Sequence, residues 1–301
     1  MKVAVIGANG QLGSDLCRVL NAKQLEVVPL TRRDVDVSDA AQVDRALDAA
    51  RPEMVISTAA YHKVDECERQ PERSFAVNAI GPRNLARACR RIGALLVHFS
   101  TDYVFDGKAR RPYLETDMPG PQNVYAVSKL AGECMIPFNC ARYLVIRTCG
   151  LYGLAGSAGK GGNFVETMLK KAADGAGIRV VHDQVATPTF TGDLADAVSR
   201  IILPEFGGRA EASGIYHITN EGECSWYDFA RKIFEIEGLH PDLQAVTTPE
   251  IFSPVQRPAY SVLSKQKLNR LGLSMPRWEE GLARYFAARR ARVRQSSPTP
   301  A

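Results

Sequence analysis

Short apolar runs alternate with amphipathic stretches along the first half of the chain. The runs have the length of buried strands and cover residues 2–6, 26–30, 54–60, 94–100 and 142–147. Helical spacing of apolar residues or helix-favouring composition marks residues 11–22, about 39–50, 71–92 and the segment after Tyr125. Strands that alternate with helices of this length predict a doubly wound α/β fold with a mostly parallel sheet.

The pattern changes after about residue 150, where the elements become shorter and need partners far away in the sequence. We therefore predict a first domain over residues 1–150 and a smaller C-terminal lobe over 151–285, with excursions back to the first domain. Residues 153–162 contain five glycines, which predicts either a loop that closes over a ligand or a plain surface connection. Residues 286–301 are basic, and we predict a disordered tail there.

The net charge of +5 does not indicate nucleic-acid binding, because it is concentrated near the C-terminus. Residues 284–301 carry five arginines and no acidic residue, so the rest of the chain is neutral overall. No uncharged run is long enough for a membrane span, and the five histidines show no metal-ligand spacing. Met1 leads directly into the first predicted strand, so we expect no signal peptide and a cytoplasmic protein.

A glycine-spaced turn follows the first predicted strand and opens the first predicted helix. It reads Gly7-Ala-Asn-Gly-Gln-Leu-Gly13, and we expect Gly7, Asn9, Gly10, Gln11, Leu12 and Gly13 to contact a dinucleotide. Glycines allow a tight turn and a close approach to a pyrophosphate, whose charge is met by N–H groups at the helix start. The strand before the turn and the helix after it are the context that this motif requires. Residues 1–150 are therefore predicted to be a Rossmann-like dinucleotide-binding domain.

The end of the second predicted strand bears on the choice of cofactor. Arg32 and Arg33 stand where a basic residue would contact the 2′-phosphate of NADP, and Asp36 and Val37 are expected beside the adenine. NADP is therefore the predicted cofactor and NAD is the alternative. Arg32 could also be an ordinary solvated cation in a turn.

Tyr125 and Lys129 form the one Tyr-x-x-x-Lys pair in the chain, and this spacing puts both on one face of a helix. Reduction of a ketone needs a proton donor, and a nearby ammonium is expected to lower the pKa of tyrosine towards the working range. The same lysine can hold the nicotinamide ribose. Ser100 and Thr101 end a strand at the sheet edge where ligands bind, so a hydroxyl is available to hold a carbonyl oxygen.

These motifs together resemble the dTDP-4-dehydrorhamnose reductase family of the extended short-chain dehydrogenase/reductase superfamily. The likeness reaches about residue 285. It is strongest in Phe99-Ser-Thr-Asp-Tyr-Val-Phe-Asp-Gly107 and in Asn123-Val-Tyr-Ala-Val-Ser-Lys-Leu-Ala-Gly-Glu133. The resemblance implies NADPH-dependent reduction of the 4-keto group of a dTDP-6-deoxy-4-hexulose, which gives dTDP-L-rhamnose. A homodimer stays an open alternative to a monomer.

The resemblance also implies roles for particular residues. Thr101, Tyr125 and Lys129 would form the catalytic triad, Asp102 and Tyr103 would lie near the sugar, and Ala59, Ala60 and Tyr61 would line the cofactor. From its charge alone, Arg257 is either a clamp on a nucleotide phosphate or a turn cation. Asn78 is interpreted either as a partner in a proton relay or as a buried helix amide, and Trp226 as a core residue.

Two departures from the family pattern leave alternatives open. Gly150 stands where better-known members carry an aromatic residue over the sugar, and acidic residues for a magnesium ion between subunits have no convincing counterparts. The alternatives are a non-catalytic, cofactor-binding regulatory subunit and an epimerase or dehydratase acting on another nucleotide sugar. The complete triad favours the reductase.

Overall fold

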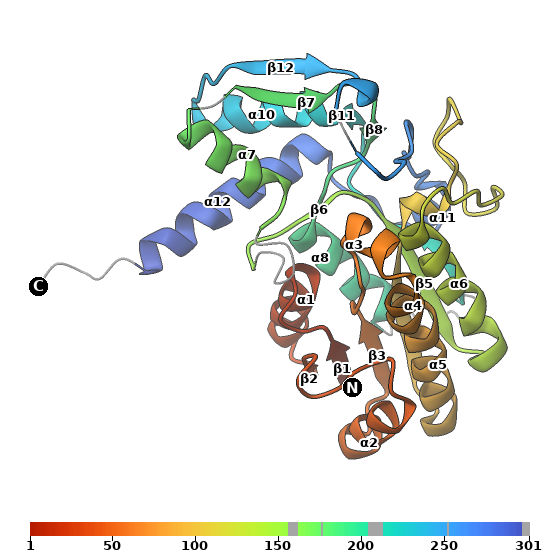
Figure 1. The fold of residues 1–301 in the computed structure, drawn as a ribbon. Coiled ribbons are helices and arrows are strands. Elements are labelled where there is room, and N and C mark those ends of the chain that lie inside the picture. Colours follow the sequence, from red (N-terminus) through yellow and green to blue (C-terminus); the bar gives the residue numbers. More distant parts are fainter. Residues whose placement is uncertain (156–161, 176, 204–212, 252, 297–301) are drawn as a thin grey trace, which may run out of the picture.

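The protein is described here by a computed structural model, which covers residues 1–155, 162–175, 177–203, 213–251 and 253–296. Its centre is a six-stranded sheet in the order β10-β5-β4-β3-β1-β2 (Figure 1), and every neighbouring pair is parallel. The strands are β1 Lys2–Ile6, β2 Glu26–Leu30, β3 Met54–Ser57, β4 Leu95–Thr101, β5 Tyr143–Thr148 and β10 Gly214–His217. The predicted doubly wound, Rossmann-like fold is confirmed.

Helices cover both faces of this sheet. Successive residues of a strand point to opposite faces, and those that point to either face are mostly apolar. Val3 and Val5 belong to the core that includes α1 Gln11–Ala22 and α8 Thr191–Ile202. Ala4 and Ile6 belong to the core on the other face, under α2 Ala40–Ala50, α5 Gly81–Ile92 and α6 Val124–Asn139. Near-continuous apolar strands are expected where a parallel sheet is buried on both faces.

Short helical segments lead into these longer helices. They are α3 Val64–Arg69, α4 Pro71–Phe75, η1 Ala76–Ile80 and η2 Asp102–Val104. The single helix predicted over 71–92 is therefore α4, the π-helical turn η1 and α5 in succession. Pro82 explains the irregular turn, because it has no N–H to donate to the carbonyl of Asn78. A Cβ at Gly132 of α6 would overlap that same Asn78 oxygen, so α6 packs directly on the irregular turn.

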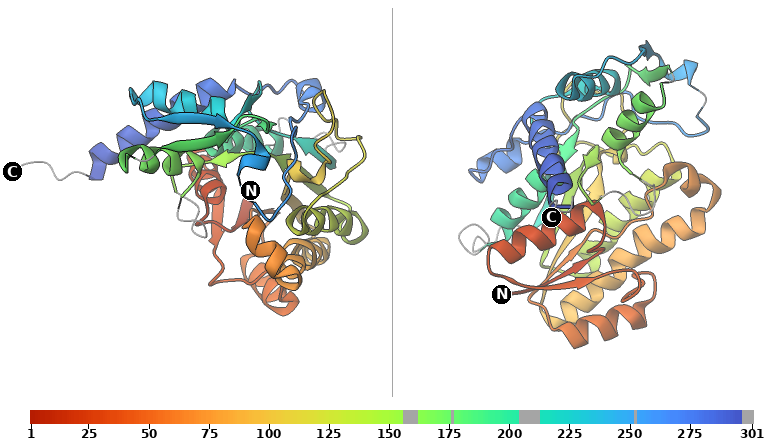
Figure 2. Two further views of the ribbon diagram at one scale, coloured as in Figure 1. Left: turned by 45° about the horizontal axis from the view of Figure 1, so that its top comes forward. Right: turned by 90° about the vertical axis from the view of Figure 1, so that its left-hand side faces the viewer.

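The smaller lobe lies at one end of the sheet domain (Figure 2) and has its own core of aromatic and aliphatic residues. It contains the parallel pair β7 Ile178–Val181 and β12 Leu243–Val246, and the antiparallel pair β8 Val185–Ala186 and β11 Cys224–Ser225. Its helices are α7 Phe164–Ala173, α10 Trp226–Glu237, η3 Thr248–Glu250 and α12 Trp278–Ser296. The pair β6 Leu151–Tyr152 and β9 Thr189–Phe190 and the short helix α11 Gln266–Arg270 complete the described elements. Because α8 and β10 lie in the sheet domain, the chain returns there from the lobe.

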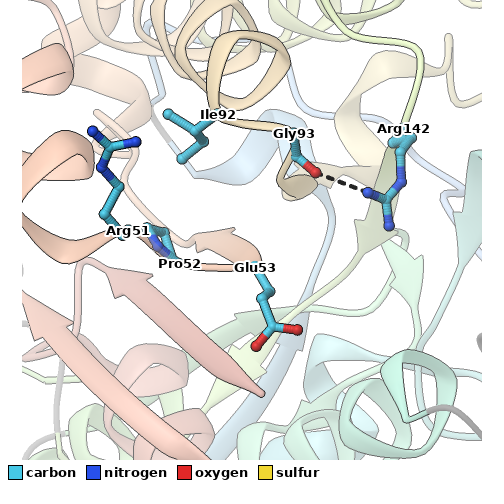
Figure 3. A pocket seen from close by; sticks show the side chains of 6 residues that line it. All are labelled: Arg51, Pro52, Glu53, Ile92, Gly93 and Arg142. Carbon is cyan, nitrogen blue, oxygen red and sulfur yellow. Dashed lines mark hydrogen bonds between the residues drawn. The ribbon is translucent and has the colours of Figure 1, made fainter.

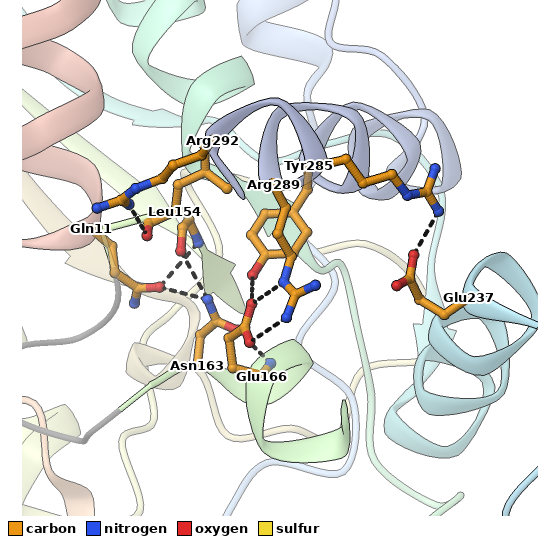
Figure 4. Close-up of polar contacts among 10 residues, drawn as sticks. Gln11, Leu154, Asn163, Glu166, Glu237, Tyr285, Arg289 and Arg292 are labelled. Atoms are coloured by element: carbon orange, nitrogen blue, oxygen red, sulfur yellow. Dashed lines mark hydrogen bonds and ion pairs between the residues drawn. The ribbon is translucent and has the colours of Figure 1, made fainter. Parts of the chain in front are cut away.

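The prediction of a disordered tail over residues 286–301 is wrong for residues 286–296, because these residues continue α12. Phe286 is buried in the lobe core, and Arg289 Nε donates to Glu166 Oε1 of α7 at 2.8 Å (Figure 4). Arg290 also pairs with Glu237 of α10, at 2.6 Å. The arginines therefore have acidic partners in other elements, which the local sequence does not reveal. Residues 297–301, like 156–161 of the predicted glycine-rich loop, lie outside the described residues.

None of the helices in the described part of the chain combines the length and the apolarity that a membrane crossing needs.

A buried ion pair joins α6 to β5. Arg147 Nη2 donates to Glu133 Oε2 at 2.7 Å and Arg147 Nε to Glu133 Oε1 at 3.0 Å, with the two side chains 2% and 3% exposed. The guanidinium also lies over the ring of Phe105, with its carbon 5.0 Å from the ring centre. Two parallel hydrogen bonds fix the position of α6 relative to β5.

Replacing Arg147 with Met should leave the Glu133 carboxylate buried without its partner. We expect Arg147→Met to lower the free energy of unfolding by about 3–5 kcal/mol, measured by urea denaturation. The matched control is Arg91→Met, which breaks exposed pairs with Asp44 and Asp48 and should cost less than about 1 kcal/mol. Equal losses in the two variants would contradict this view of the buried pair.

Candidate active site

The glycine turn between β1 and α1 is shaped by close backbone contacts. Gly7 has φ +81°, and a Cβ there would lie 2.5 Å from Thr58 Oγ1. A Cβ at Gly13 would overlap the carbonyl oxygen of Gly7. Gly10 occupies the N-cap of α1 without a side chain to cap it, so the first N–H groups of the helix are left for another acceptor. The turn therefore fits a pyrophosphate, which needs a side-chain-free cradle and helix N–H donors.

The other residues predicted in this turn differ in what they expose. Asn9 is exposed, whereas the side chain of Leu12 is buried in the core, which leaves only its backbone for a cofactor. Gln11 Oε1 accepts from Gly153 N at 3.0 Å and from Asn163 Nδ2 at 3.2 Å (Figure 4). The Gln11 side chain therefore connects the turn to the smaller lobe, which the sequence analysis did not foresee.

The end of β2 lies beside the glycine turn, because Gly7 N donates to Leu30 O at 2.8 Å. Arg32 and Arg33 follow and are exposed, and Arg32 Nη2 lies 3.9 Å from Asp36 Oδ2. Asp36 Oδ1 accepts from Ser38 Oγ at 2.6 Å, and this bond lowers the pKa of Asp36. Both arginines are thus exposed at this turn, and Arg32 has a long contact with the Asp36 carboxylate.

The segment that follows β3 places Ala59, Ala60 and Tyr61, all partly exposed, along the same sheet edge. Asn78 holds this segment: its Oδ1 accepts from Tyr61 N at 2.8 Å, and its Nδ2 donates to Tyr61 O at 2.8 Å and to Ser128 Oγ at 3.0 Å. The amide groups of Asn78 are used within the protein. This favours the buried-amide interpretation over the proton relay.

Thr101 and Tyr125 are brought together at the carboxyl end of β4. Their side chains lie close enough for the Thr101 hydroxyl to act on the pKa of Tyr125, and Thr101 Oγ1 accepts from Tyr103 N at 3.2 Å. The start of α6 is fixed by Asn123, whose Oδ1 accepts from Ala126 N at 2.9 Å, so Tyr125 lies in a well-anchored first turn. The predicted meeting of a tyrosine and a strand-end hydroxyl is therefore present.

Lys129 lies one turn further along α6 and is 1% exposed. Its Nζ donates to Phe99 O at 2.6 Å and lies 3.2 Å from His98 Nε2. Burial lowers the pKa of Lys129 to about 8, with Glu133 acting in the opposite direction.

The expectation that Lys129 lowers the pKa of Tyr125 is wrong for this structure. Burial raises the pKa of Tyr125 above its ordinary value of 10.0, and the hydrogen bond from Thr101 opposes this rise. The physical reason is that the ammonium of Lys129 donates to Phe99 O, between α6 and the sheet. Tyr125 is consequently a protonated phenol at neutral pH.

The residues predicted near the sugar divide into a buried and an accessible group. Asp102 is 3% exposed; its carboxylate accepts from Thr101 Oγ1 at 3.1 Å and from Cys149 Sγ at 2.9 Å, and burial raises its pKa. Asp102 thus braces Thr101 from inside the protein. Tyr103 is partly exposed, its ring edge-on to that of Tyr125 with centres 6.1 Å apart.

Arg257 lies near Tyr103, since its charge acts to lower the pKa of Tyr103 against the effect of burial. Its Nη1 donates to Ser253 Oγ at 2.7 Å, and its Nη2 lies 3.5 Å from Asp65 Oδ1. The guanidinium therefore has weak carboxylate pairing and stands beside the accessible side of the site. This placement is what a phosphate clamp requires.

Gly150 has φ +56°, and a Cβ there would lie 3.1 Å from Pro188 Cα and 3.5 Å from Trp226 Cη2. The ring of Trp226 thus adjoins the place of a side chain at position 150. Trp226 is partly exposed and packs on Phe164 with ring centres 4.8 Å apart. It lies at the margin of the lobe core, and not fully within it as predicted.

A separate hollow (Figure 3) lies away from this chemistry and is lined by Arg51, Pro52, Glu53, Ile92, Gly93 and Arg142. Glu53 precedes β3 and Arg142 precedes β5, so the hollow borders the amino ends of the strands. Thr101 ends β4 at the opposite edge. The hollow is therefore not part of the candidate active site. Among the described residues, no cluster of His, Cys, Asp and Glu could hold a metal ion.

The buried ammonium of Lys129 should lower stability below its pKa. With the pKa at about 8 in the folded protein against 10.5 ordinarily, the unfolded chain binds the proton more tightly, so this penalty applies fully below pH 8 and is relieved between pH 8 and 10.5. We expect Lys129→Met to raise the free energy of unfolding at pH 7 by roughly 1–3 kcal/mol. Urea denaturation across this range should show the gain shrinking as pH rises.

Lys232→Met, which removes a surface ammonium paired with Glu235, is the control and should change stability by less than about 0.5 kcal/mol. A gain for Lys129→Met that stays constant with pH would contradict a depressed lysine pKa.

Comparison with known proteins agrees with this geometry. The family model described as RmlD substrate binding domain matches residues 1–291. The spore coat polysaccharide biosynthesis protein SpsK of Bacillus subtilis is 41% identical over 288 residues, covering 96% of this chain and 98% of SpsK. The dTDP-4-dehydrorhamnose reductase of Streptomyces griseus is 38% identical over 299 residues, covering 98% of this chain and 96% of that protein.

A solved structure shows the same fold. The crystal structure of dTDP-4-dehydrorhamnose reductase from Bacillus anthracis in complex with NADP superposes with a TM-score of 0.89 at 38% identity, covering 95% of this chain and 99% of that one. Both the family model and the relatives extend over nearly the whole chain. The protein therefore belongs to the dTDP-4-dehydrorhamnose reductase family.

Proposed function

We propose that this protein uses NADPH to reduce the 4-keto group of a dTDP-6-deoxy-4-hexulose and so produces dTDP-L-rhamnose. The observation that carries the proposal is the approach of the Thr101 hydroxyl to the Tyr125 phenol at the carboxyl end of the sheet, in a chain of this family. A ketone oxygen that approaches this pair meets two hydroxyl groups. The bound NADPH supplies the hydride to the sugar C4.

Tyr125 is the proton donor in this proposal. Its raised pKa keeps the phenol protonated at neutral pH, so a proton is available as negative charge develops on the sugar oxygen. Thr101 holds that oxygen by turning towards it the hydroxyl hydrogen that Asp102 accepts, at 3.1 Å, while the sugar is absent. Lys129 contributes a positive charge beneath the site, which stabilises the same developing charge.

Cofactor and substrate bind on opposite sides of this pair. Gly7, Gly10 and Gly13 with the start of α1 hold the pyrophosphate of the cofactor, and Ala59–Tyr61 line its path towards Tyr125. Arg257 and Tyr103 are proposed to hold the nucleotide diphosphate and the sugar, because a guanidinium suits phosphate oxygens. The NADP bound to the Bacillus anthracis relative supports the cofactor assignment.

The first test is turnover of NADPH with a panel of nucleotide 4-keto sugars. We expect oxidation of NADPH with the dTDP-6-deoxy-4-hexulose, and Tyr125→Phe should lower kcat by at least about 100-fold with nearly unchanged cofactor affinity. Cofactor affinity is measured by NADPH fluorescence. Tyr143→Phe, at the amino end of β5 and so at the opposite sheet edge, is a control that removes a phenol outside the proposed site.

Full turnover by Tyr125→Phe would remove Tyr125 as the acid. Cofactor binding without turnover of any sugar in the panel would instead indicate the non-catalytic regulatory subunit. Purified protein that retains tightly held NAD would indicate an epimerase.

Cofactor preference gives a second test. If Arg32 and Arg33 contact the 2′-phosphate, changing both to Ala should lower kcat/KM for NADPH by roughly 10- to 100-fold and leave that for NADH nearly unchanged. Initial rates with each cofactor provide the comparison. Arg45→Ala, on the next helix, controls for loss of surface charge. Equal use of NADPH and NADH by the unmodified enzyme would contradict the assignment.

A further inference from the structure

His98 is a polar side chain in an apolar layer. It lies on β4, opposite Ser57 of β3 and Val145 of β5, on the sheet face covered by α5 and α6. It is 1% exposed, and its Nε2 lies 3.2 Å from Lys129 Nζ. The imidazole is neutral, because burial and the nearby Lys129 charge both lower the pKa of His98 well below its ordinary value.

The contact with Lys129 determines which nitrogen of His98 carries the proton. An ammonium has donors and no acceptor, so the Nε2 that faces it must be unprotonated and Nδ1 must hold the hydrogen. His98 Nδ1 is fully buried, and it has no hydrogen-bond partner among the described residues. A buried N–H without a partner is a cost to stability that an apolar side chain would avoid. The histidine therefore contributes something other than stability.

The charges around Lys129 show what a neutral acceptor contributes. The titratable and charged groups nearby are His98 of β4, Tyr125 and Glu133 of α6, Arg147 of β5, and Cys67 and Asp102 around Tyr125. Glu133 is held by two hydrogen-bonding nitrogens of Arg147, so its charge is largely matched. Lys129 is then a buried cation whose close acceptors, Phe99 O and His98 Nε2, are both neutral. A carboxylate at position 98 would cancel this charge, whereas an imidazole holds it without cancelling it.

We propose that neutral His98 is a positioning residue for the reduction, accepting a hydrogen bond from Lys129 so that the ammonium stays charged with one N–H bond free for the reacting groups. Three N–H bonds radiate from Nζ, and in the described part of the chain Phe99 O and His98 Nε2 take two of them. The third is left for the cofactor ribose or for Tyr125. This inference depends on the role of Lys129 in the proposed function.

The protonation of His98 can be measured on the unmodified, full-length protein with NADP bound. Long-range proton–nitrogen correlation spectra distinguish the two neutral forms of each of the five histidines, and His98→Gln identifies the signal of His98. We expect the Nδ1–H form, unchanged between about pH 6 and pH 7.5, where Lys129 keeps its proton. An Nε2–H form, or titration to imidazolium within that range, would overturn the proposal. This measurement does not depend on turnover or on the folding of a variant.

Kinetics test the consequence for Lys129. Single-turnover oxidation of NADPH with the 4-keto sugar should lose rate above a pKa of about 8 in the unmodified enzyme, as Lys129 loses its proton. His98→Leu removes the acceptor and should move this fall in rate down by about one pH unit, with KM for the sugar changed less than about threefold. His98→Gln keeps an acceptor near the Nε2 position and should keep the pH profile of the unmodified enzyme.

Val145→Ala is the matched control, because it removes volume opposite His98 and keeps both hydrogen-bond acceptors of Lys129. It should leave the pH profile in place, and a His98→Leu profile identical to that of Val145→Ala would overturn the proposal. No turnover by the unmodified enzyme would refute the proposed function, and the nuclear magnetic resonance measurement would still decide how His98 contacts Lys129.

Discussion

The inner face of α6 carries charged side chains that must be accommodated where the helix packs on β4 and β5. Glu133 is paired with Arg147, whereas Lys129 is held by the carbonyl of Phe99 and by His98. Each interaction sets the height and rotation of α6 on the sheet, and hence the position of Tyr125 one turn earlier. Burial of a cation is costly unless it is well hydrogen-bonded. The site therefore depends on a helix whose position is set by buried polar residues as well as by apolar packing.

The buried polar residues between α6 and the sheet also explain why Tyr125 and Lys129 have different electrostatic environments although they share a helix face. Tyr125 lies at the open edge of the sheet with Thr101, and Lys129 lies one turn deeper under Phe99 and His98. Depth, more than sequence spacing, determines which groups each residue meets. The phenol stays protonated and the ammonium stays beneath it, which suits a proton donor supported by a fixed positive charge.

Local sequence pattern was sufficient for the first five strands of the sheet, for the glycine turn and for the meeting of Thr101 with Tyr125, because each depends on periodicity or on a short motif. The sixth strand, β10, was predicted in the smaller lobe, although it pairs with β5. It was insufficient wherever the partner is distant in the chain. Nothing near Gln11 indicates Gly153 or Asn163, and nothing near Arg289 indicates Glu166. The direction of the tyrosine pKa shift also could not be read from a four-residue spacing, since burial depends on the whole fold. His98 lies in a run that looks like an ordinary strand.

The pairing of strands in the sheet also constrains the order in which the parts of the protein can fold during synthesis. Its edge strand β10 pairs with β5, yet Gly214–His217 are synthesised only after much of the smaller lobe has emerged. The helix α12, which packs into the lobe core through Tyr285 and Phe286, follows still later in the chain. Domains often fold in turn as a chain leaves the ribosome. Here neither part can be completed early, so the growing chain keeps apolar surface uncovered until α12 has emerged.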